Sequence, residues 1–269
     1  MPGLPQPRDH PQGVRKMIAL SLGWGVQSFT LAAMVALGEL SPIDAAIHAD
    51  TTHERADTYT FATRWTPWLE ARGVKVVTVS DKVAAMQIYR GKGQTHPPFY
   101  TNNPKGKHGK ARRSCTSRWK IQPIRRYLQT HRNKQPVELW LGISIDEAAR
   151  MKPSDVKYIT NRWPLIEKRM SRNNCVQWLQ AHGLEVPPKS SCVFCPYHDS
   201  RAWAELKTRG DGDWQKAVKV DEAIRKARPP YDLFVHPARI PLVDVDLRTA
   251  EERGQLRLWD EECEGMCGL

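Results

Sequence analysis

The feature that most constrains the fold is an alternation of short apolar runs with helical patterns in the first half of the chain. The apolar runs Met17–Leu22, Ile43–Ala49 and Val74–Val79 have the length and composition of buried strands. Between them lie two segments with helical spacing, Phe29–Leu40 and Ala56–Ala71. This order predicts an α/β fold with a doubly wound, mostly parallel sheet.

The second half of the chain continues this pattern and then changes. A long Gly/Lys/His/Pro-rich loop is predicted over Gly91–Arg113, a helix over Ile121–His131 and a strand over Val137–Ile143. After about residue 160 the strand pattern stops. Three further helices are predicted, over Ser171–His182, around Ala202–Lys207 and over Trp214–Lys226. We therefore expect a disordered leader (1–16), an α/β domain (17–160) and a helical C-terminal part (161–269) with a cysteine loop and a mobile tail.

Charge and length narrow the class of protein. The 269 residues carry a net charge of +12, and Lys and Arg concentrate in Arg90–Arg132 and Lys216–Arg228. A solvated basic surface would explain this, but the clustering favours a polyanionic partner such as DNA or tRNA. No apolar run reaches the length of a membrane span, and the first 16 residues lack the apolar core of a signal peptide. We expect a cytoplasmic protein with no membrane partner.

The turn after the first strand reads Ser21-Leu-Gly-Trp-Gly-Val-Gln-Ser28. Glycines that precede a helix allow backbone amides to approach an anion, so the turn is a candidate phosphate cradle, although an ordinary tight turn would look the same. It has neither the Walker nor the Rossmann glycine spacing. Asp50 and Gly142–Glu147 also follow predicted strands, so one crevice could hold all three segments.

Four of the six cysteines have a spacing that suggests metal chemistry. Cys192 and Cys195 form a C-x2-C pair followed by Pro196, while Cys175 lies on a predicted helix and Cys115 in a basic segment. Three interpretations fit: a [4Fe–4S] cluster, a structural zinc site, and redox or packed thiols. The single C-x2-C unit in a late loop favours the cluster over the other two.

The remaining cysteines, Cys263 and Cys267, lie among acids and glycines close to the end of the sequence. A thiol that carries sulfur has to reach a site and leave it again, so a mobile catalytic role is one interpretation. Incidental exposed thiols are the other, and neighbouring acids would raise the thiol pKa.

Several segments, in order, resemble the PAPS reductase-like family of the PP-loop ATP pyrophosphatase superfamily. The turn Ser21–Ser28 resembles the family's SGGxDS loop, with Gln27 in place of the usual Asp, and the segment Asp50–Glu54 resembles its acidic stretch. Three more segments resemble family motifs and complete a match over roughly 17–207: Cys115-Thr-Ser-Arg-Trp-Lys120-Ile-Gln-Pro123, Gly142-Ile-Ser-Ile-Asp146-Glu147-Ala-Ala-Arg150 and Trp163-Pro164-Leu165-Ile166.

The resemblance implies a set of site residues. The cysteine arrangement is similar to that of the sulfurtransferase of DNA phosphorothioation systems, which implies [4Fe–4S] ligation by Cys115, Cys175, Cys192 and Cys195. ATP and Mg²⁺ are the implied cofactors, with Asp50 catalytic and the tail ending Cys267-Gly-Leu269 similar to a mobile catalytic cysteine. The residues implied to bind the nucleotide, with Arg169 as a further candidate, are Ser21, Gly23, Gly25, Gln27, Ser28, Asp50, Lys120, Gly142 and Arg150.

Three functions follow as alternatives. The first is ATP-dependent adenylation of a substrate followed by sulfur transfer, with nucleic acid as the expected acceptor and a cysteine desulfurase as donor. The second is a sulfonucleotide reductase in which Cys267 attacks the sulfonate and a thioredoxin-like protein recycles it. The third is a nucleic-acid-binding protein without catalysis, for which Gln27 in place of Asp would be an argument.

Overall fold

A computed structural model describes residues 15–90, 97–102 and 108–248. The chain forms two compact units, each assembled from segments that are far apart in the sequence. Unit 1 holds the described residues up to Asp50 together with Asp57–Ser80 and Lys120–Ser190. Unit 2 holds Thr51–Ala56 together with the described residues of 81–119 and 191–248. The predicted division into 1–16, 17–160 and 161–269 stays a prediction.

Unit 1 is built on a five-stranded sheet in which every neighbouring pair is parallel. Its strands, in spatial order, are β3 (Val76–Ser80), β2 (Ala45–Asp50), β1 (Met17–Ser21), β6 (Val137–Leu141) and β7 (Ile159–Arg162). The chain builds outward from β1 to β3, and then crosses back to add β6 and β7 on the other side of β1. The predicted α/β doubly wound, parallel sheet is therefore confirmed.

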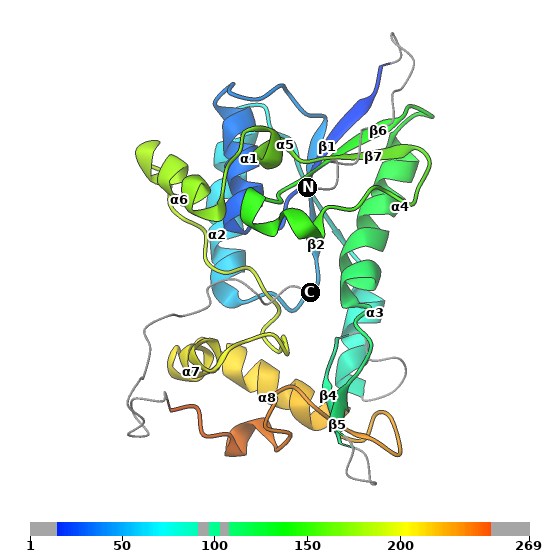
Figure 1. The fold of residues 1–269 in the computed structure, drawn as a ribbon, viewed down its shortest axis with the longest axis vertical. Helices are drawn as coiled ribbons and strands as arrows, with labels where there is room; N and C mark the ends of the chain where they lie inside the picture. The colour runs from blue at the N-terminus through cyan, green and yellow to red at the C-terminus, as the bar shows by residue number, and fades with distance from the viewer. Residues whose placement is uncertain (1–14, 91–96, 103–107, 249–269) are drawn as a thin grey trace. The chain divides into compact units, whose positions relative to one another are not determined.

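Helices cover both faces of this sheet (Figure 1). Alternation along β1 and β2 directs Leu20 and Ala46 to one core and Ala19 and Ile47 to the other. The first core is closed by α1 (Val26–Ala36), α2 (Ala56–Glu70), α5 (Pro164–Glu167) and α6 (Arg172–Ala181), and the second by α4 (Gln122–His131).

Several element boundaries differ from the predictions. Helix α1 begins at Val26 rather than Phe29, so the end of the glycine turn is already helical. A π-helix, Thr116–Ile121, precedes α4, and β7 was not predicted because its four residues include only one apolar side chain. The predicted N-cap Ser171 is confirmed: its hydroxyl accepts a hydrogen bond from the Asn174 amide, in a capping box.

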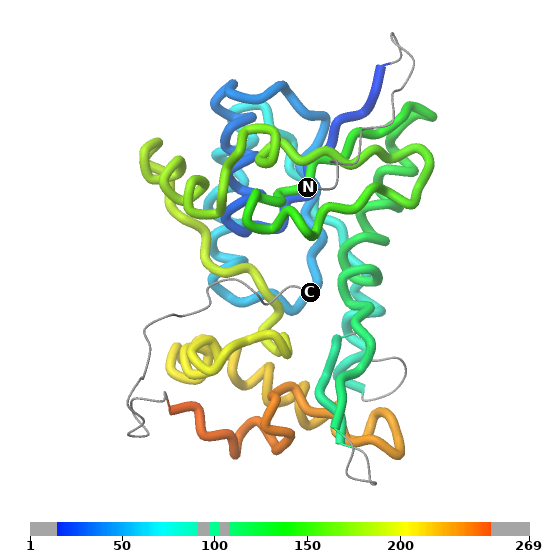
Figure 2. The backbone as a smooth tube through the Cα atoms, in the orientation of Figure 1, coloured from blue at the N-terminus to red at the C-terminus, as the bar shows by residue number. Residues whose placement is uncertain are grey.

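Unit 2 contains a three-stranded antiparallel sheet in the order β5 (His108–Lys110), β4 (Tyr100–Asn102) and β8 (Asp232–Phe234). Figure 2 shows the segments around residues 100–102 and 232–234 side by side. Strands β4 and β5 lie inside the predicted loop Gly91–Arg113, so that prediction is wrong for its described part. The helices of unit 2 are α3 (Lys82–Met86), α7 (Ser200–Thr208), α8 (Asp213–Ile224) and the 3-10 helices Gln87–Arg90 and Leu242–Asp244.

Two further predictions concern parts outside the described residues. Cys263 and Cys267 lie there, as does most of the predicted leader. Within the described chain, no helix combines the length and hydrophobicity that crossing a membrane requires.

Candidate functional site

Hydrogen bonds to serine hydroxyl groups hold the turn after β1 in one conformation. The amide of Gly23 donates to Ser28 Oγ over 3.1 Å, and the Ser28 hydroxyl donates to the carbonyl of Gly25 over 3.2 Å. From a distant part of unit 1, the Ser190 hydroxyl donates to the carbonyl of Gly23 over 2.7 Å. These bonds fix the path of the backbone at the carboxyl end of β1.

Trp24, at the centre of the turn, anchors it to the core. Its φ of 56° lies in the left-handed region, which is unfavourable for a large side chain. The ring is only 1% exposed and packs against Phe29, His48 and Phe61 at centroid distances of 6.2 to 6.4 Å. Burial of the indole offsets the backbone strain. The packing of this ring therefore stabilises the turn in addition to the hydrogen bonds described above.

The turn leads directly into α1, whose N-terminus has no side-chain cap. Gly25 is the N-cap of α1 and supplies no side-chain acceptor. The first backbone bond of the helix runs from Phe29 to the carbonyl of Gly25. Within the described chain, the amides of Val26, Gln27 and Ser28 have no recorded acceptor, as expected for a first turn without a cap. Three N–H groups and the positive end of the helix dipole are therefore available to an anion.

Neither Gly23 nor Gly25 is required by the protein's own packing. A Cβ at Gly23 would lie 3.7 Å from Ser28 Oγ, and one at Gly25 would lie 3.8 Å from Ser190 Cβ, which are ordinary contacts. Neither residue has a φ in the left-handed region. Glycine at these positions leaves backbone accessible that a side chain would cover, which suits a ligand that approaches closely.

Gly142 is different, because the fold itself requires it. A Cβ there would lie 2.8 Å from the Ser28 nitrogen and 3.1 Å from the Gln27 carbonyl carbon. Gly142 directly follows β6, the strand beside β1 at which the chain reverses its order in the sheet. The predicted proximity of the two glycine segments is thus present in the structure, at the position where open α/β sheets bind ligands.

Side chains beyond Gly142 contact the same helix start. Gln27 Nε2 donates to Ser144 Oγ over 3.4 Å and to Glu147 Oε2 over 3.3 Å. Arg150, a predicted nucleotide-binding residue, donates to Glu147 Oε1 over 2.5 Å. Gln27 thus links the turn to the carboxylate of Glu147, which lies in the predicted segment Gly142–Arg150, and Arg150 balances that carboxylate's charge.

Three other predicted site residues of unit 1 lie on separate elements of the fold. Asp50 ends β2, where its Oδ1 accepts a hydrogen bond from the Tyr59 hydroxyl over 2.7 Å. Lys120 lies in the π-helix, and Arg169 is exposed just after α5, with a φ of 53°.

Cys175 is fully buried in the apolar core of unit 1, where α6 packs against α1. Burial raises the pKa of its thiol to about 11, and a hydrogen bond with Thr30 opposes this rise only in part. The described part of unit 1 therefore holds Cys175 as a protonated thiol among hydrocarbon side chains.

The other three candidate ligands belong to unit 2. The Cys195 amide donates to the Cys192 carbonyl over 3.0 Å, which closes the C-x2-C turn. The His198 ring contacts that same carbonyl at 2.9 Å, and the Cys192 sulfur lies 3.5 Å from Thr51 Oγ1. Cys115 and Cys192 are both half-buried against the same apolar core.

A buried polar segment, Thr51–Ala56, supports this cysteine loop. It forms a β-bridge between Glu54 and Cys192, and the Val193 amide donates to the carbonyl of His53 over 2.8 Å. The His53 ring is 2% exposed and packs against Trp119 and Phe194.

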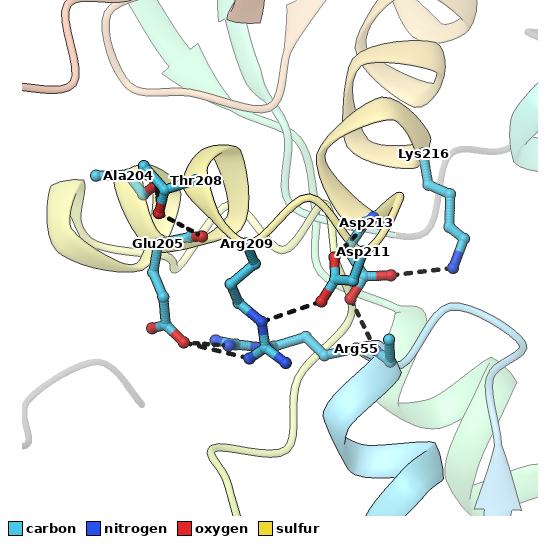
Figure 3. A network of polar contacts seen from close by, with 9 residues as sticks. Arg55, Ala204, Glu205, Thr208, Arg209, Asp211, Asp213 and Lys216 are labelled. Atoms are coloured by element: carbon cyan, nitrogen blue, oxygen red, sulfur yellow. Dashed lines mark hydrogen bonds and ion pairs between the residues drawn. The ribbon is translucent and has the colours of Figure 1, made fainter.

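Charged residues fasten the same segment to the helices α7 and α8 (Figure 3). Arg55, whose side chain is 4% exposed, donates to Glu205 over 2.6 Å, and the Ala56 amide donates to Asp213 over 2.7 Å. Arg209 reaches Glu205 at 3.3 Å. Burial opposes ionisation of Glu205, but the bonds from Arg55 and Arg209 outweigh it and lower the pKa of this carboxyl. Arg55 was missed by the sequence reasoning, since one arginine after an acidic stretch carries no distinctive spacing.

The described residues contain no group of three or more His, Cys, Asp or Glu side chains arranged to hold a metal ion. The described cysteines, Cys115, Cys175, Cys192 and Cys195, form no disulfide with one another. The iron–sulfur cluster and Mg²⁺ consequently stay predictions.

Comparison with solved structures finds similar folds at low sequence identity. Phosphoadenylyl-sulfate (PAPS) reductase from Candida auris, in complex with phosphate, is 12% identical with a TM-score of 0.41; the match covers 64% of this chain and 76% of that chain. The U34-tRNA thiolase NcsA from Methanococcus maripaludis, with its [4Fe-4S] cluster, is 14% identical with a TM-score of 0.39, over 80% of this chain and 72% of that chain. No protein-family model and no curated protein matches the sequence.

Proposed function

We propose that the chain is a PAPS reductase-like PP-loop enzyme that binds ATP at the turn Ser21–Ser28, adenylates a substrate and enables sulfur transfer to it. The observation that carries the proposal is the uncapped N-terminus of α1, presented between glycines at the carboxyl ends of β1 and β6. Such a start of a helix binds phosphate through its N–H groups and its dipole.

The residues of the turn bind and orient the triphosphate. The amides of Val26, Gln27 and Ser28 donate to phosphate oxygens, and the absence of a Cβ at Gly23 and Gly25 lets those oxygens reach the backbone. Because Ser28 and Trp24 already fix this backbone, little conformational entropy is lost when ATP binds.

The chemistry that follows activates a substrate oxygen. This oxygen attacks the α-phosphorus of ATP, the bond to the β-phosphate breaks, and pyrophosphate leaves with its electron pair. The substrate then carries AMP on that oxygen. A sulfur nucleophile then attacks the substrate atom that bears this oxygen. The bond from that atom to the oxygen breaks, and the oxygen leaves with the electron pair as part of AMP, so sulfur replaces oxygen.

Mg²⁺ would be held by the phosphates together with one or two carboxylates, which is the coordination it usually adopts. Glu147 supplies a carboxylate 3.3 Å from Gln27, and Asp50 supplies one at the end of β2, so the donor types of unit 1 fit the ion. When bound, Mg²⁺ neutralises charge that develops on the leaving pyrophosphate.

Cys115, Cys192 and Cys195 would hold the [4Fe–4S] cluster in unit 2, with Cys175 as the predicted fourth ligand. The tight C-x2-C turn and the half-buried setting of these three thiols fit cluster ligation, whereas the core position of Cys175 fits it less well. When bound, the cluster would carry or activate sulfur. A cysteine desulfurase is the proposed donor, and nucleic acid the proposed acceptor.

Formation of AMP and pyrophosphate from ATP tests the proposal directly. The protein is incubated with ATP, Mg²⁺, sulfide and unmodified tRNA or DNA, and is compared with Gly25→Ala. The variant keeps its stability within about 1 kcal/mol, because Ala fits the space and the extended backbone. We expect at least a tenfold lower affinity for ATP, since the added methyl covers the phosphate-binding amides. Equal ATP affinity in the two proteins would overturn the assignment of the turn.

A second incubation, with a sulfonucleotide added, separates the alternatives. Release of sulfite from a sulfonucleotide, with no cleavage of ATP, would establish the reductase in place of the sulfurtransferase. Nucleic-acid binding without either reaction would establish the non-catalytic alternative. Iron and sulfide counting on anaerobically purified Cys192→Ala, Cys175→Ala and wild-type protein then tests the cluster. If Cys175→Ala retains its iron, the predicted four-cysteine set is wrong.

A further inference from the structure

Unit 2 carries a group of cations that the proposed chemistry does not use. Lys110 Nζ lies 4.6 Å from the centre of the Tyr100 ring and 5.2 Å from that of Tyr197. Arg113 lies 5.4 Å from the Tyr197 ring, and Arg239 lies 5.4 Å from the Tyr100 ring. These five residues form what we call the tyrosine–cation patch.

The cations of the patch are not neutralised within the described chain. None of Lys110, Arg113 and Arg239 forms an ion pair with a described carboxylate, whereas Arg225 and Lys226 of the same unit do. Their recorded polar contacts are neutral: Arg113 donates to Thr116 Oγ1 over 3.0 Å and Arg239 to the Pro237 carbonyl over 3.1 Å. Like charges that share two rings repel one another, and an anion bound between them relieves that repulsion.

The two rings hold the cations in place before any partner binds. Tyr100 is 9% exposed, and its hydroxyl donates to the Pro196 carbonyl over 3.3 Å, so its ring is fixed against the cysteine loop. Cation–π contacts of this kind contribute about 0.5–1 kcal/mol each at exposed sites. Lys110 and Arg113 remain exposed, and therefore accessible to a partner, despite these contacts.

The patch adjoins two of the candidate ligand cysteines. Arg113 precedes Cys115 by two residues, and Tyr197 follows Cys195 by two residues. An anionic polymer bound at the patch would therefore pass beside the thiols of unit 2. Several fixed cations in one place match a chain of regularly spaced phosphates better than they match one small anion.

We propose that the tyrosine–cation patch binds the phosphodiester backbone of the nucleic acid acceptor and presents it to the cysteine loop. This inference rests on the proposed function for the identity of the acceptor, but not for the presence of the surface. Lys110, Arg113 and Arg239 each contact phosphate, and no base is read at this site. Binding is consequently independent of sequence and steeply dependent on salt.

The test compares the wild-type chain with two variants of equal net charge. The patch variant carries Lys110→Gln, Arg113→Gln and Arg239→Gln. The control variant carries Lys82→Gln, Lys207→Gln and Lys226→Gln, which remove the same charge from exposed positions elsewhere in unit 2. Binding of a fluorescein-labelled single-stranded oligonucleotide and of tRNA is followed by anisotropy over a series of NaCl concentrations.

We expect the patch variant to bind at least about tenfold more weakly at low salt, and its slope of log K against log salt to fall by about 2, because roughly 0.7 is lost for each single-strand phosphate contact. The control variant should keep nearly the wild-type slope. Equal losses in both variants, or none in either, would overturn the patch. A variant that lost affinity for phosphatidylserine vesicles but not for nucleic acid would overturn it as well.

Binding of a fluorescent ATP analogue is measured on the same three proteins. All three should bind it equally, because the turn in unit 1 is unchanged. A wild-type protein that binds nucleic acid through the patch but binds no ATP would refute the proposed function alone. ATP binding by all three proteins, with no loss of nucleic-acid affinity in the patch variant, would refute the patch alone.

Discussion

The two candidate sites of this molecule differ in whether backbone groups or side chains form them. In unit 1 the site is made of backbone: glycines, three helix amides and the ends of two parallel strands. In unit 2 the surroundings of the cysteine loop are made of side chains, with the buried charged residues Arg55 and Asp213 bound between the segment Thr51–Ala56 and the helices α7 and α8. The contrast indicates that steric changes should damage the first site most, and changes of charge or pH the second.

The sharpest test of this contrast is the substitution Gly142→Ala. The new Cβ would lie 2.8 Å from the Ser28 nitrogen, in backbone that cannot rotate away as a side chain could. We expect a loss of about 1–3 kcal/mol of stability, together with the loss of ATP binding, because α1 must shift. Urea denaturation and ATP titration measure the two effects. If Gly142→Ala is as stable as Gly25→Ala, the close approach of α1 and β6 is not as described.

Removal of a buried charge should be the next largest effect. Arg55→Met keeps most of the volume but leaves Glu205 and the surrounding polar segment without the guanidinium. We expect a loss of about 1–3 kcal/mol, since Arg55 is buried while its partner Glu205 remains half exposed. The matched control in unit 1 is Arg64→Met, which breaks an exposed pair with Glu185 and should cost at most about 0.5 kcal/mol. Similar losses in both variants would remove the contrast between the units.

Acid should weaken unit 2 through Glu205. The pKa of this carboxyl is lowered in the folded protein, so the unfolded chain takes up its proton at a higher pH than the folded one does. The stability that it contributes is present above its ordinary pKa of about 4.3 and is lost as the pH falls through the lower folded value. Melting temperatures measured from neutral to acidic pH should therefore fall less steeply for Glu205→Gln than for wild type. A parallel course for the two proteins would show that Glu205 carries no such contribution.

The smallest expected effect belongs to a hydroxyl that supports the glycine turn. Ser190→Ala removes the hydrogen bond to the Gly23 carbonyl and leaves the core untouched. We expect the Kd for ATP to rise by about threefold, which corresponds to ~0.6 kcal/mol, with no measurable change in stability. Isothermal titration of ATP into both proteins measures it. A large loss of stability would mean that Ser190 holds more of unit 1 than this one bond.

Sequence patterns predicted the parallel sheet because its inner strands carry continuous apolar runs. They failed at β7, whose sequence Ile-Thr-Asn-Arg has no apolar run, and at β4, β5 and β8, which are too short to show a period of two. The start of α1 was placed at Phe29 because Val26, Gln27 and Ser28 look like a continuation of the turn. Only the position of Gly25 as a cap reveals that they are helical.

The candidate site was predictable to a similar, partial extent. Glycines and cysteines have characteristic spacings, so the turn and the C-x2-C pair could be singled out from the sequence. The contact between Gly142 and Ser28, the pairing of Glu147 with Gln27 and the burial of Arg55 depend on how distant segments pack. The core position of Cys175 was among the alternatives, but the spacing of its helix alone did not decide it.

The close approach of Gly142 to Ser28 also has a consequence for how the protein is made. The turn and α1 leave the ribosome early, whereas β6, which must lie against them, is synthesised only after the strands β1 to β5 and the helices α1 to α4. A nascent chain that ends before Val137 contains every residue of the glycine turn but lacks β6 and the Gly142 that its first helical turn rests against. The turn would therefore acquire its final shape late in synthesis, when β6 inserts beside β1.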